Sequence, residues 1–391
     1  MLSCEDISWG QNPVRRCITL SRAGGERPLK EQSMNVFIAG DIRGAYRSEE
    51  LVSILAKDPD VHIYVNEMKF KSRFRKLISK FGAMITLLSC DCVWVLPCQH
   101  ETVFLKQAVR FKKKLVTDFY LSFYDTAVND RKKLQPGSRK AKKKLKSDVY
   151  ALTHSDKVLF LNESECDYYT SLCGVDRRSI GTEIVPLCIP DKKKAELPYF
   201  HKKRDFIRFT WCGTYIPLQG LEKVIKAFAL LKKEGVDARL TVWGDSDAKA
   251  APYRRLADRL KCSDSIDFIN DKWGDVECWE QYISSESDCS MGIFGDSVKA
   301  HTVLANKVLD GVAFKTPVIT APSGGVAEYF DESSMVIAEP EPEAICEAMK
   351  KVAKADIGTI ESMTGKAYDI YKENFTRECY EKRVKDILKE L

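Results

Sequence analysis

The feature that most constrains the fold is an alternation of short apolar runs with amphipathic stretches, which begins at Met34. The first runs, each of which we predict to be a strand, are NVFIAG, VHIYV, CVWVLP, KLVT, KVLFL and EIVPL. The stretches between them are long enough for crossover helices, which consecutive parallel strands require. This pattern predicts an α/β domain with a doubly wound, Rossmann-like sheet.

A second series of the same kind follows a charged, proline-containing stretch, IPDKKKAELPYFHKKRD, that has no apolar period. Its predicted strands are IRFTWCG, ARLTVWG, SIDFI, DCSMGIFG, TPVIT and SMVIA. We therefore expect two Rossmann-like domains that face each other across a cleft, with ligands beyond the carboxyl ends of the strands. The predicted parts are an N-terminal domain (34–190), a linker (191–205), a C-terminal domain (206–375) and a last helix (376–391) that packs back on the N-terminal domain.

The first 33 residues show no sustained period and predict no regular element. Lys30 and Glu31 can be encoded by AAGGAG, a ribosome-binding sequence, shortly before Met34. Two interpretations stay open: residues 1–33 are a disordered leader, or Met34 is the true start of the protein.

The charge of the chain is unevenly distributed. Residues 101–204 hold 23 Lys and Arg against 13 Asp and Glu, although the whole chain has a net charge of only +6. From Arg131 to Lys146 there are nine basic residues and no acidic one. A basic run beside apolar and aromatic residues suits an anionic lipid surface, and a solvated flexible loop is the alternative. No recognised nucleic-acid-binding module accompanies the charge, so we expect no nucleic acid as partner.

The fourteen cysteines include no CxxC pair and lie in apolar segments, so we expect free, buried thiols in a reducing cytosol and no metal site. The N-terminus lacks the apolar region of a secretory signal. The most apolar stretch, Gly82–Cys98, is short for a bilayer span and contains Asp91. We expect a cytoplasmic protein that is soluble or peripheral to a membrane.

The first candidate site is the stretch WCGTYIPLQGLEKVI, in which a glycine ends a strand and Gly220 opens a helix. Without a side chain, glycine lets a ligand approach the backbone, and the free N–H groups of a helix start attract phosphate. An ordinary turn between strand and helix is the alternative.

The second candidate site is FGDSVKAHTVLANKVLDGVAFKTPVIT, which begins at Phe294. Lys299 and His301 lie in the predicted loop, and we expect one helical face to present Asn306, Lys307 and Asp310. A carboxylate can accept hydrogen bonds from two ribose hydroxyls, and an ammonium can neutralise phosphate. An exposed Lys–Asp pair on a surface helix is the alternative.

Together, these two stretches and the following PSGGVAEYF resemble the C-terminal half of glycosyltransferase family 4 enzymes, which have the GT-B fold. The N-terminal half resembles the family more loosely, through LVTDFYLSFYDTAVNDRK and HSDKVLFLNESECDYY. The resemblance implies that the C-terminal domain binds a nucleotide-sugar donor and the N-terminal domain an acceptor, usually with retention of anomeric configuration.

By position, the resemblance places Asp310 at the second acid of the family's Glu-x7-Glu signature and Gly213 and Gly220 in the diphosphate loop. The chain departs from the family at three positions: Thr302 stands for the first acid, and Thr214 and Gln219 replace the basic pair. The histidine usual after the fourth strand is also absent, with Asp118 nearby, and we expect His154 to be a plain helix-end residue.

We take Asp118, Lys299 and Lys307 as the candidate catalytic residues, with Lys299 and Lys307 neutralising the diphosphate. The candidate donor-binding residues are Gly213, Thr214, Gln219, Gly220, Phe294, Gly295, Lys299, Asn306, Lys307 and Asp310. The candidate acceptor and membrane surface consists of Arg131, Lys132, Lys133, Arg139, Lys140, Lys142, Lys143 and Lys144.

The sequence thus predicts a glycosyltransferase that moves a hexose-type sugar from a nucleoside diphosphate to a lipid-linked or polysaccharide acceptor. Envelope or capsule glycan synthesis is the context that the resemblance implies, at the inner face of the membrane and with no cofactor. Two alternatives stay open: a nucleotide-sugar epimerase of the same fold, and a nucleotide-sugar-binding protein without activity, which the departures at Thr302, Thr214 and Gln219 would suit.

Overall fold

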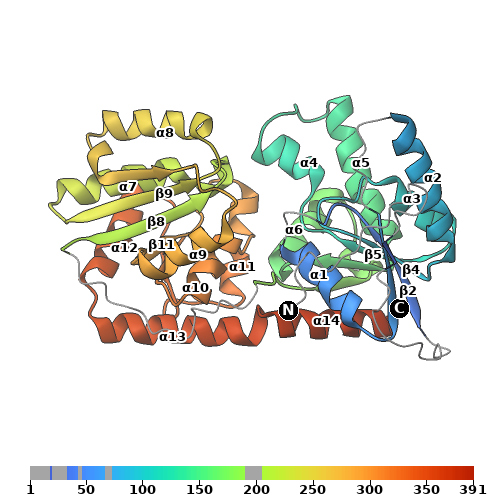
Figure 1. Ribbon diagram of the computed structural model, residues 1–391. Helices are drawn as coiled ribbons and strands as arrows, with labels where there is room; N and C mark the ends of the chain where they lie inside the picture. The colour runs from blue at the N-terminus through green and yellow to red at the C-terminus, as the bar shows by residue number, and fades with distance from the viewer. Residues whose placement is uncertain (1–17, 20–32, 43–45, 67–72, 190–204) are drawn as a thin grey trace.

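The computed structural model describes residues 18–19, 33–42, 46–66, 73–189 and 205–391, so nearly all of the predicted linker and of the predicted leader lie outside the described residues. Two lobes are built around two separate sheets (Figure 1). The α/β, two-sheet architecture predicted from the alternating pattern is confirmed. The exact domain boundaries stay our proposal.

The sheet of the N-terminal lobe has the strand order β1-β3-β2-β4-β5-β6-β7, and every pair except β1 with β3 is parallel. Its predicted strands all form: β2 Met34–Ala39, β3 Val61–Asn66, β4 Cys92–Val95, β5 Lys114–Asp118, β6 Lys157–Phe160 and β7 Thr182–Ile184. One prediction is wrong: residues 1–33 contain a regular element, because β1 (Ile18–Thr19) pairs antiparallel with β3. A strand of two residues is too short to show a periodicity in the sequence. It forms only by pairing with β3, which lies far along the chain.

Helices cover both faces of this sheet (Figure 1). They are α1 Tyr46–Lys57, α2 Arg73–Ser89, α3 Val103–Arg110, α4 Phe123–Asp125, α5 Arg139–His154 and α6 Glu163–Cys173, with a π-helical turn η2 Thr126–Asp130 and a 3-10 turn η3 Arg177–Ser179. Alternate strand residues point to opposite faces, so Phe37 and Ile38 belong to two different cores. The core around Phe37 includes residues of α2, α3, α5 and α6.

The sheet of the C-terminal lobe is parallel, with the order β10-β9-β8-β11-β12-β13. All six predicted strands form: β8 Ile207–Gly213, β9 Ala238–Gly244, β10 Ile266–Ile269, β11 Cys289–Met291, β12 Val318–Thr320 and β13 Val336–Ile337. The strand β11 ends earlier than we expected, so the segment from Gly292 to Gly295 lies beyond it.

The helices of this lobe are α7 Leu221–Lys233, α8 Asp247–Arg259, α9 Val276–Ser285, α10 Asn306–Ala313, α11 Gly324–Ala327, α12 Pro342–Lys354 and α13 Ile357–Asn374, with 3-10 turns η4 Pro217–Gln219, η5 Ser263–Ser265 and η6 Val298–His301. The apolar face expected for α7 is buried against the sheet. The chain then returns to the other lobe, because Tyr380, Val384 and Ile387 of α14 (Arg377–Glu390) pack in the core around Ile38 (Figure 1).

The cysteines behave as the composition indicated. The twelve described ones are free and eight of them are buried. Within the described part of the chain, no helix is long and apolar enough to cross a bilayer. The same residues include no group of three or more His, Cys, Asp and Glu that could hold a metal ion.

Candidate functional site

The C-terminal sheet reverses its strand order between β8 and β11, which lie side by side although seven further elements separate them in the sequence. In doubly wound sheets, such a reversal leaves a crevice at the carboxyl ends of the two strands, and ligands bind there. Both candidate stretches of the sequence begin at this edge, one after β8 and the other after β11.

The loop after β8 is closely packed on itself. The side-chain Oε1 of Gln219 accepts a hydrogen bond of 3.0 Å from the backbone N–H of Thr214. A Cβ on Gly213 would come within 2.5 Å of that same Oε1 atom, so this loop conformation requires glycine there. Gln219, which stands where the family has a basic residue, therefore holds the loop through hydrogen bonding.

The two candidate stretches contact each other directly. The backbone N–H of Gly295 donates to the carbonyl of Leu218 over 3.1 Å, and Leu218 packs with Ile293 and Ala300 in a small apolar cluster. Gly220 has a φ of 64° and lies against Phe294, where a Cβ would come within 2.4 Å of the Phe294 carbonyl carbon. The structure therefore brings together Gly213, Thr214, Gln219, Gly220, Phe294 and Gly295.

Two helices begin at this edge without side-chain caps among the described residues. The N-cap of α7 is Gly220 and the N-cap of α10 is Ala305, and neither residue type can supply a side-chain acceptor. The first N–H groups of a helix have no partner within the helix, and the helix dipole places partial positive charge at the same end. Both helix starts can therefore accept an anion.

Lys307 is buried, with 7% of its surface exposed, and its Nζ lies 4.2 Å from the centre of the Trp211 ring. The Nζ has no hydrogen-bond partner among the described residues. Burial lowers the pKa of this ammonium to about 7, although the neighbouring Cys212 opposes the shift. An anion that reaches this Nζ would stabilise the charged form of Lys307.

The expectation that one face of α10 presents three polar side chains is wrong. Asn306 is exposed, Asp310 is half-buried, and Lys307 points to the sheet. Neighbouring helical residues are about 100° apart, and the long apolar stem of a lysine can be buried where its head finds an aromatic face. Lys307 and Asp310 still share a neighbour, because both influence the pKa of the Cys212 thiol, which burial raises to about 12.

Lys299 lies close to the other lobe. Burial raises the pKa of three groups there: Cys98 to about 11, Glu165 to about 8, and also the Asp130 carboxyl. The positive charge of Lys299 opposes each of these rises. Lys299 is itself buried, with 8% of its surface exposed. The side chain therefore lies between the lobes, facing groups that follow β4, β5 and β6 of the N-terminal sheet.

Asp118 lies inside the N-terminal lobe. It is fully buried and accepts a 2.5 Å hydrogen bond from Nε of Arg47. The Nη1 of Arg47 also donates to the carbonyls of Val185 and Pro186. Burial raises the pKa of the Asp118 carboxyl and the guanidinium opposes that rise. The structure gives Asp118 a role in holding three segments together, and Asp118 and Lys299 share a neighbour, because both influence the pKa of Cys98.

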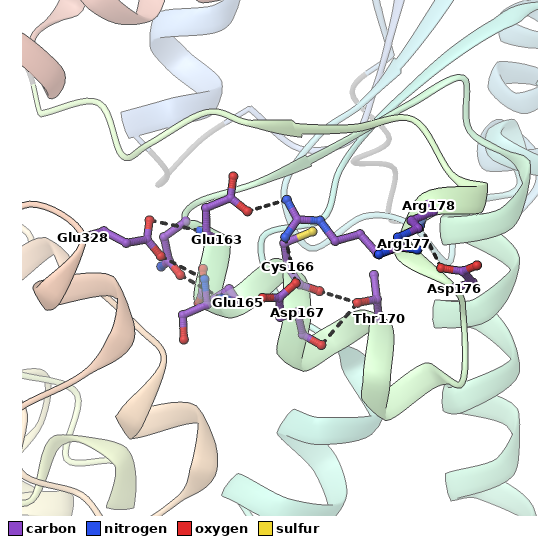
Figure 2. A network of polar contacts seen from close by, with 11 residues as sticks. Glu163, Glu165, Cys166, Asp167, Thr170, Asp176, Arg177, Arg178 and Glu328 are labelled. Atoms are coloured by element: carbon purple, nitrogen blue, oxygen red, sulfur yellow. Dashed lines mark hydrogen bonds and ion pairs between the residues drawn. The ribbon is translucent and has the colours of Figure 1, made fainter.

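The lobes also touch at the segment that holds Gly324, Gly325 and Glu328 (Figure 2). The carboxylate of Glu328 accepts hydrogen bonds from the backbone N–H groups of Glu163 (3.0 Å) and Ser164 (2.9 Å), the first two residues of α6. A Cβ on Gly325 would come within 2.7 Å of the Asn162 amide nitrogen, and also of the backbone of Thr302 and Leu304. Glycine therefore allows α11, α6 and the loop before α10 to meet.

The C-terminal lobe matches a known protein family. Residues 198–369 match the family model described as glycosyl transferases group 1. The chain carries a group 1 glycosyltransferase domain. No curated protein matches the full sequence of this glycosyltransferase significantly.

Solved structures extend the likeness to both lobes. Sucrose-phosphate synthase from Thermosynechococcus elongatus is 14% identical, with a TM-score of 0.67 over 92% of this chain and 98% of its own. HepE from Anabaena, in complex with UDP-glucose, is 12% identical, with a TM-score of 0.65 over 92% of this chain and 100% of its own. A UDP-forming trehalose-phosphate synthase from Burkholderia vietnamiensis is 9% identical, with a TM-score of 0.62 over 92% and 100%. The glycosyltransferase therefore has the GT-B fold.

The basic run of the glycosyltransferase forms an exposed surface on its N-terminal lobe. All eight side chains predicted for the acceptor and membrane surface are exposed except Lys144, which pairs with Glu101 over 2.6 Å and lies over the Phe123 ring. Arg131 also influences the pKa of Cys98, which lies near Lys299. The basic surface therefore begins at the edge of the space between the lobes.

The sequence analysis missed a buried polar network in the N-terminal lobe. The Nε2 of His100 lies 2.7 Å from Asp148, and its ring stacks on Phe123. Asp148 accepts further hydrogen bonds from Ser122 and from the backbone N–H of Tyr124. Since these partners follow different strands, no local pattern could show the network. His154 ends α5 and stacks on Tyr150, as predicted for a helix-end residue.

Proposed function

We propose that this glycosyltransferase moves a sugar from a nucleoside-diphosphate sugar to a lipid-linked or polysaccharide acceptor, with retention of anomeric configuration. The observation that carries the proposal is the reversal of strand order between β8 and β11, beyond which the loop after β8 packs with the segment that leads to the uncapped start of α10. The UDP and UDP-glucose complexes of HepE, which has the same fold, support a nucleotide-sugar donor.

The diphosphate would lie at the starts of α7 and α10. Backbone N–H groups and the helix dipoles would bind its oxygens there, and Lys307 and Lys299 would supply the positive charge that the Thr214 and Gln219 positions lack. Stabilising the leaving diphosphate lowers the barrier to transfer, so no protein nucleophile is required in this scheme. We propose no cofactor besides the donor substrate.

Asp310 would bind the ribose hydroxyls, and the acceptor would enter from the N-terminal lobe past Lys299. The exposed basic surface that starts at Arg131 would attract an anionic lipid or a lipid-linked diphosphate. We therefore place the enzyme at the inner face of the membrane, in envelope or capsule glycan synthesis.

A thermal-shift panel of UDP-, GDP- and ADP-sugars tests the donor half of the proposal. A matching donor at a hundredfold excess over its Kd should stabilise the protein by about 2.7 kcal/mol. Asp310→Asn should weaken this shift, because an amide carries no charge and accepts fewer hydrogen bonds, whereas Asp258→Asn on the exposed side of α8 should not.

A panel in which no nucleotide sugar shifts the midpoint would contradict the proposal. Donor binding with neither hydrolysis of the donor nor transfer to any lipid-linked or glycan acceptor would instead favour the binding protein without activity that the substitutions at Thr302, Thr214 and Gln219 suggest.

A further inference from the structure

The helix α2 exposes an apolar stripe that the basic surface does not explain. Phe81, Ile85 and Leu88 are 71%, 57% and 46% exposed. Their spacing of four and three residues places them on one face of the helix. Ala83 and Leu87 occupy the opposite face and are buried in the lobe's core. Three large apolar side chains on one face are more than the scattered apolar residues of an ordinary surface.

The stripe is continuous with neighbouring helices of the same lobe. Lys113, just after α3, donates from Nζ to the Leu88 carbonyl at the end of α2 over 2.8 Å. On α3 itself, Val103 is 38% exposed, and Lys106 lies over the Tyr150 ring of α5. The helices α2, α3 and α5 therefore cover the same face of the N-terminal sheet, with α2 at the outer end of the lobe (Figure 1).

Among the described side chains, the charges around the stripe are mainly positive. The exposed basic side chains on α3, α5 and the segments beside them are Lys106, Arg110, Lys112, Arg139, Lys140, Lys142, Lys143 and Lys146. The sequence of α2 contains no acidic residue. Of the described acids nearby, Glu101 pairs with Lys144 and Asp156 with Lys114, whereas Asp91 is exposed and accepts hydrogen bonds from Asn35. An apolar stripe within a basic surface is complementary to a layer of anionic headgroups above acyl chains.

We propose that the face formed by α2, α3 and α5 docks on an anionic lipid bilayer, with Phe81, Ile85 and Leu88 inserted at the headgroup–acyl boundary. The basic side chains of α3 and α5 then lie among the lipid phosphates. A second copy of this chain fits less well, because a symmetric contact through α2 would bring two basic surfaces together. The inference rests on the membrane partner in the proposed function and adds apolar insertion to it.

Insertion and charge attraction respond differently to salt. The Debye length falls from ~10 Å at 0.1 M salt to ~3 Å at 1 M, so attraction between the basic side chains and lipid is screened. Apolar insertion is not weakened by screening. Binding to vesicles that survives high salt therefore measures the contribution of α2.

The test is co-flotation of the full chain with vesicles of phosphatidylglycerol and phosphatidylcholine, at both salt concentrations. Wild type should bind at ~0.1 M salt and keep measurable binding at ~1 M. Phe81→Ser/Ile85→Ser should lose on the order of tenfold or more in affinity at both concentrations. Lys140→Gln/Lys143→Gln should lose affinity only at low salt.

Ile357→Ser is the matched control, because Ile357 is 46% exposed on the C-terminal lobe and should not affect flotation. Unchanged thermal midpoints show that the variants fold. The proposal is overturned if wild type does not float with the vesicles, or if Phe81→Ser/Ile85→Ser binds them like wild type at high salt. It is also overturned if light scattering shows that wild type is a dimer and that Phe81→Ser/Ile85→Ser is a monomer. The donor-induced thermal shift is measured separately, so a failure here leaves the donor half of the proposed function standing.

Discussion

The residue that most needs a ligand in the candidate site is Lys307. Its ammonium is buried beside Trp211 with no hydrogen-bond partner among the described residues. A buried charge without a partner costs stability, and part of the cost is avoided by losing the proton, which is why burial lowers the pKa to about 7. A diphosphate at the start of α10 would favour the charged form again.

Replacing Lys307 with methionine should therefore change both stability and donor binding. Between pH 7 and the unfolded value near 10.5, the unfolded chain binds more protons, so wild-type stability rises with pH in this window and the cost is full below pH 7. Lys307→Met should remove this slope and stabilise the free protein at pH 6 by on the order of a few kcal/mol. Denaturant unfolding at several pH values measures it.

The same variant should raise the donor KM by on the order of tenfold or more, because a charge-assisted hydrogen bond to the diphosphate is lost. In wild type, donor binding should be accompanied by proton uptake near pH 7, which calorimetry in buffers of different ionisation enthalpy detects. Unchanged KM together with no proton uptake would show that Lys307 only fills space above Trp211.

At this scale, the sequence indicated which segments meet at one edge of the sheet better than it indicated the burial of their side chains. The chain positions of Gly213, Gly220 and Lys299 could be predicted, because glycines and charges directly after strands mark one edge of a sheet. The burial of a side chain could not be predicted, since it depends on contacts with residues far away in the sequence. Lys307 turns to Trp211 of β8, and Asp118 pairs with Arg47 of α1.

Among the elements, the twelve predicted strands formed because each is an apolar run bounded by glycine or polar residues. The contact between α11 and α6 could not be predicted in the same way. It consists of backbone N–H groups of α6 that donate to Glu328, and of a glycine that leaves room. Neither feature has a periodicity, and the two segments are 164 residues apart at Ser164 and Glu328.

Gly325→Ala should disturb this contact. The added methyl would lie within 2.7 Å of Asn162 from one lobe and of the backbone of Thr302 and Leu304 from the other, so one of them must move. We expect a loss of stability of about 1–3 kcal/mol, typical of overpacking, and a weaker donor-induced thermal shift, because Thr302 and Leu304 lead into α10. Thermal midpoints with and without donor measure both effects.

Gly365→Ala in α13 is the control, and we expect it to change stability in the opposite direction. Its Cβ would meet no atom within 4 Å, so the better helix propensity of alanine should stabilise the protein by about 0.5–1 kcal/mol. Equal effects of the two substitutions would show that the close approach at Gly325 does not constrain the lobes.

At the scale of the whole molecule, the last helix makes the N-terminal lobe depend on the end of the chain. The side chains of Tyr380, Val384 and Ile387 pack with strand residues of the N-terminal sheet. Arg377 forms an ion pair of 2.6 Å with Glu50, and Arg383 donates to the Ile184 carbonyl over 2.9 Å. The N-terminal fold is therefore complete only after α13 has crossed from the other lobe.

Ile387→Ala should destabilise the N-terminal lobe by about 2–5 kcal/mol, the usual cost of a cavity at a buried aliphatic residue, since Ile387 is 3% exposed. Lys389→Ala, where the side chain is 74% exposed, should change little. Calorimetry with a donor sugar separates the lobes: a ligand that binds the C-terminal lobe raises the transition of that lobe. Ile387→Ala should lower the transition temperature of the N-terminal lobe and leave the donor-dependent transition of the C-terminal lobe unchanged. A loss of the donor-dependent transition as well would mean that the lobes unfold as one cooperative unit, with α14 as the element that couples them.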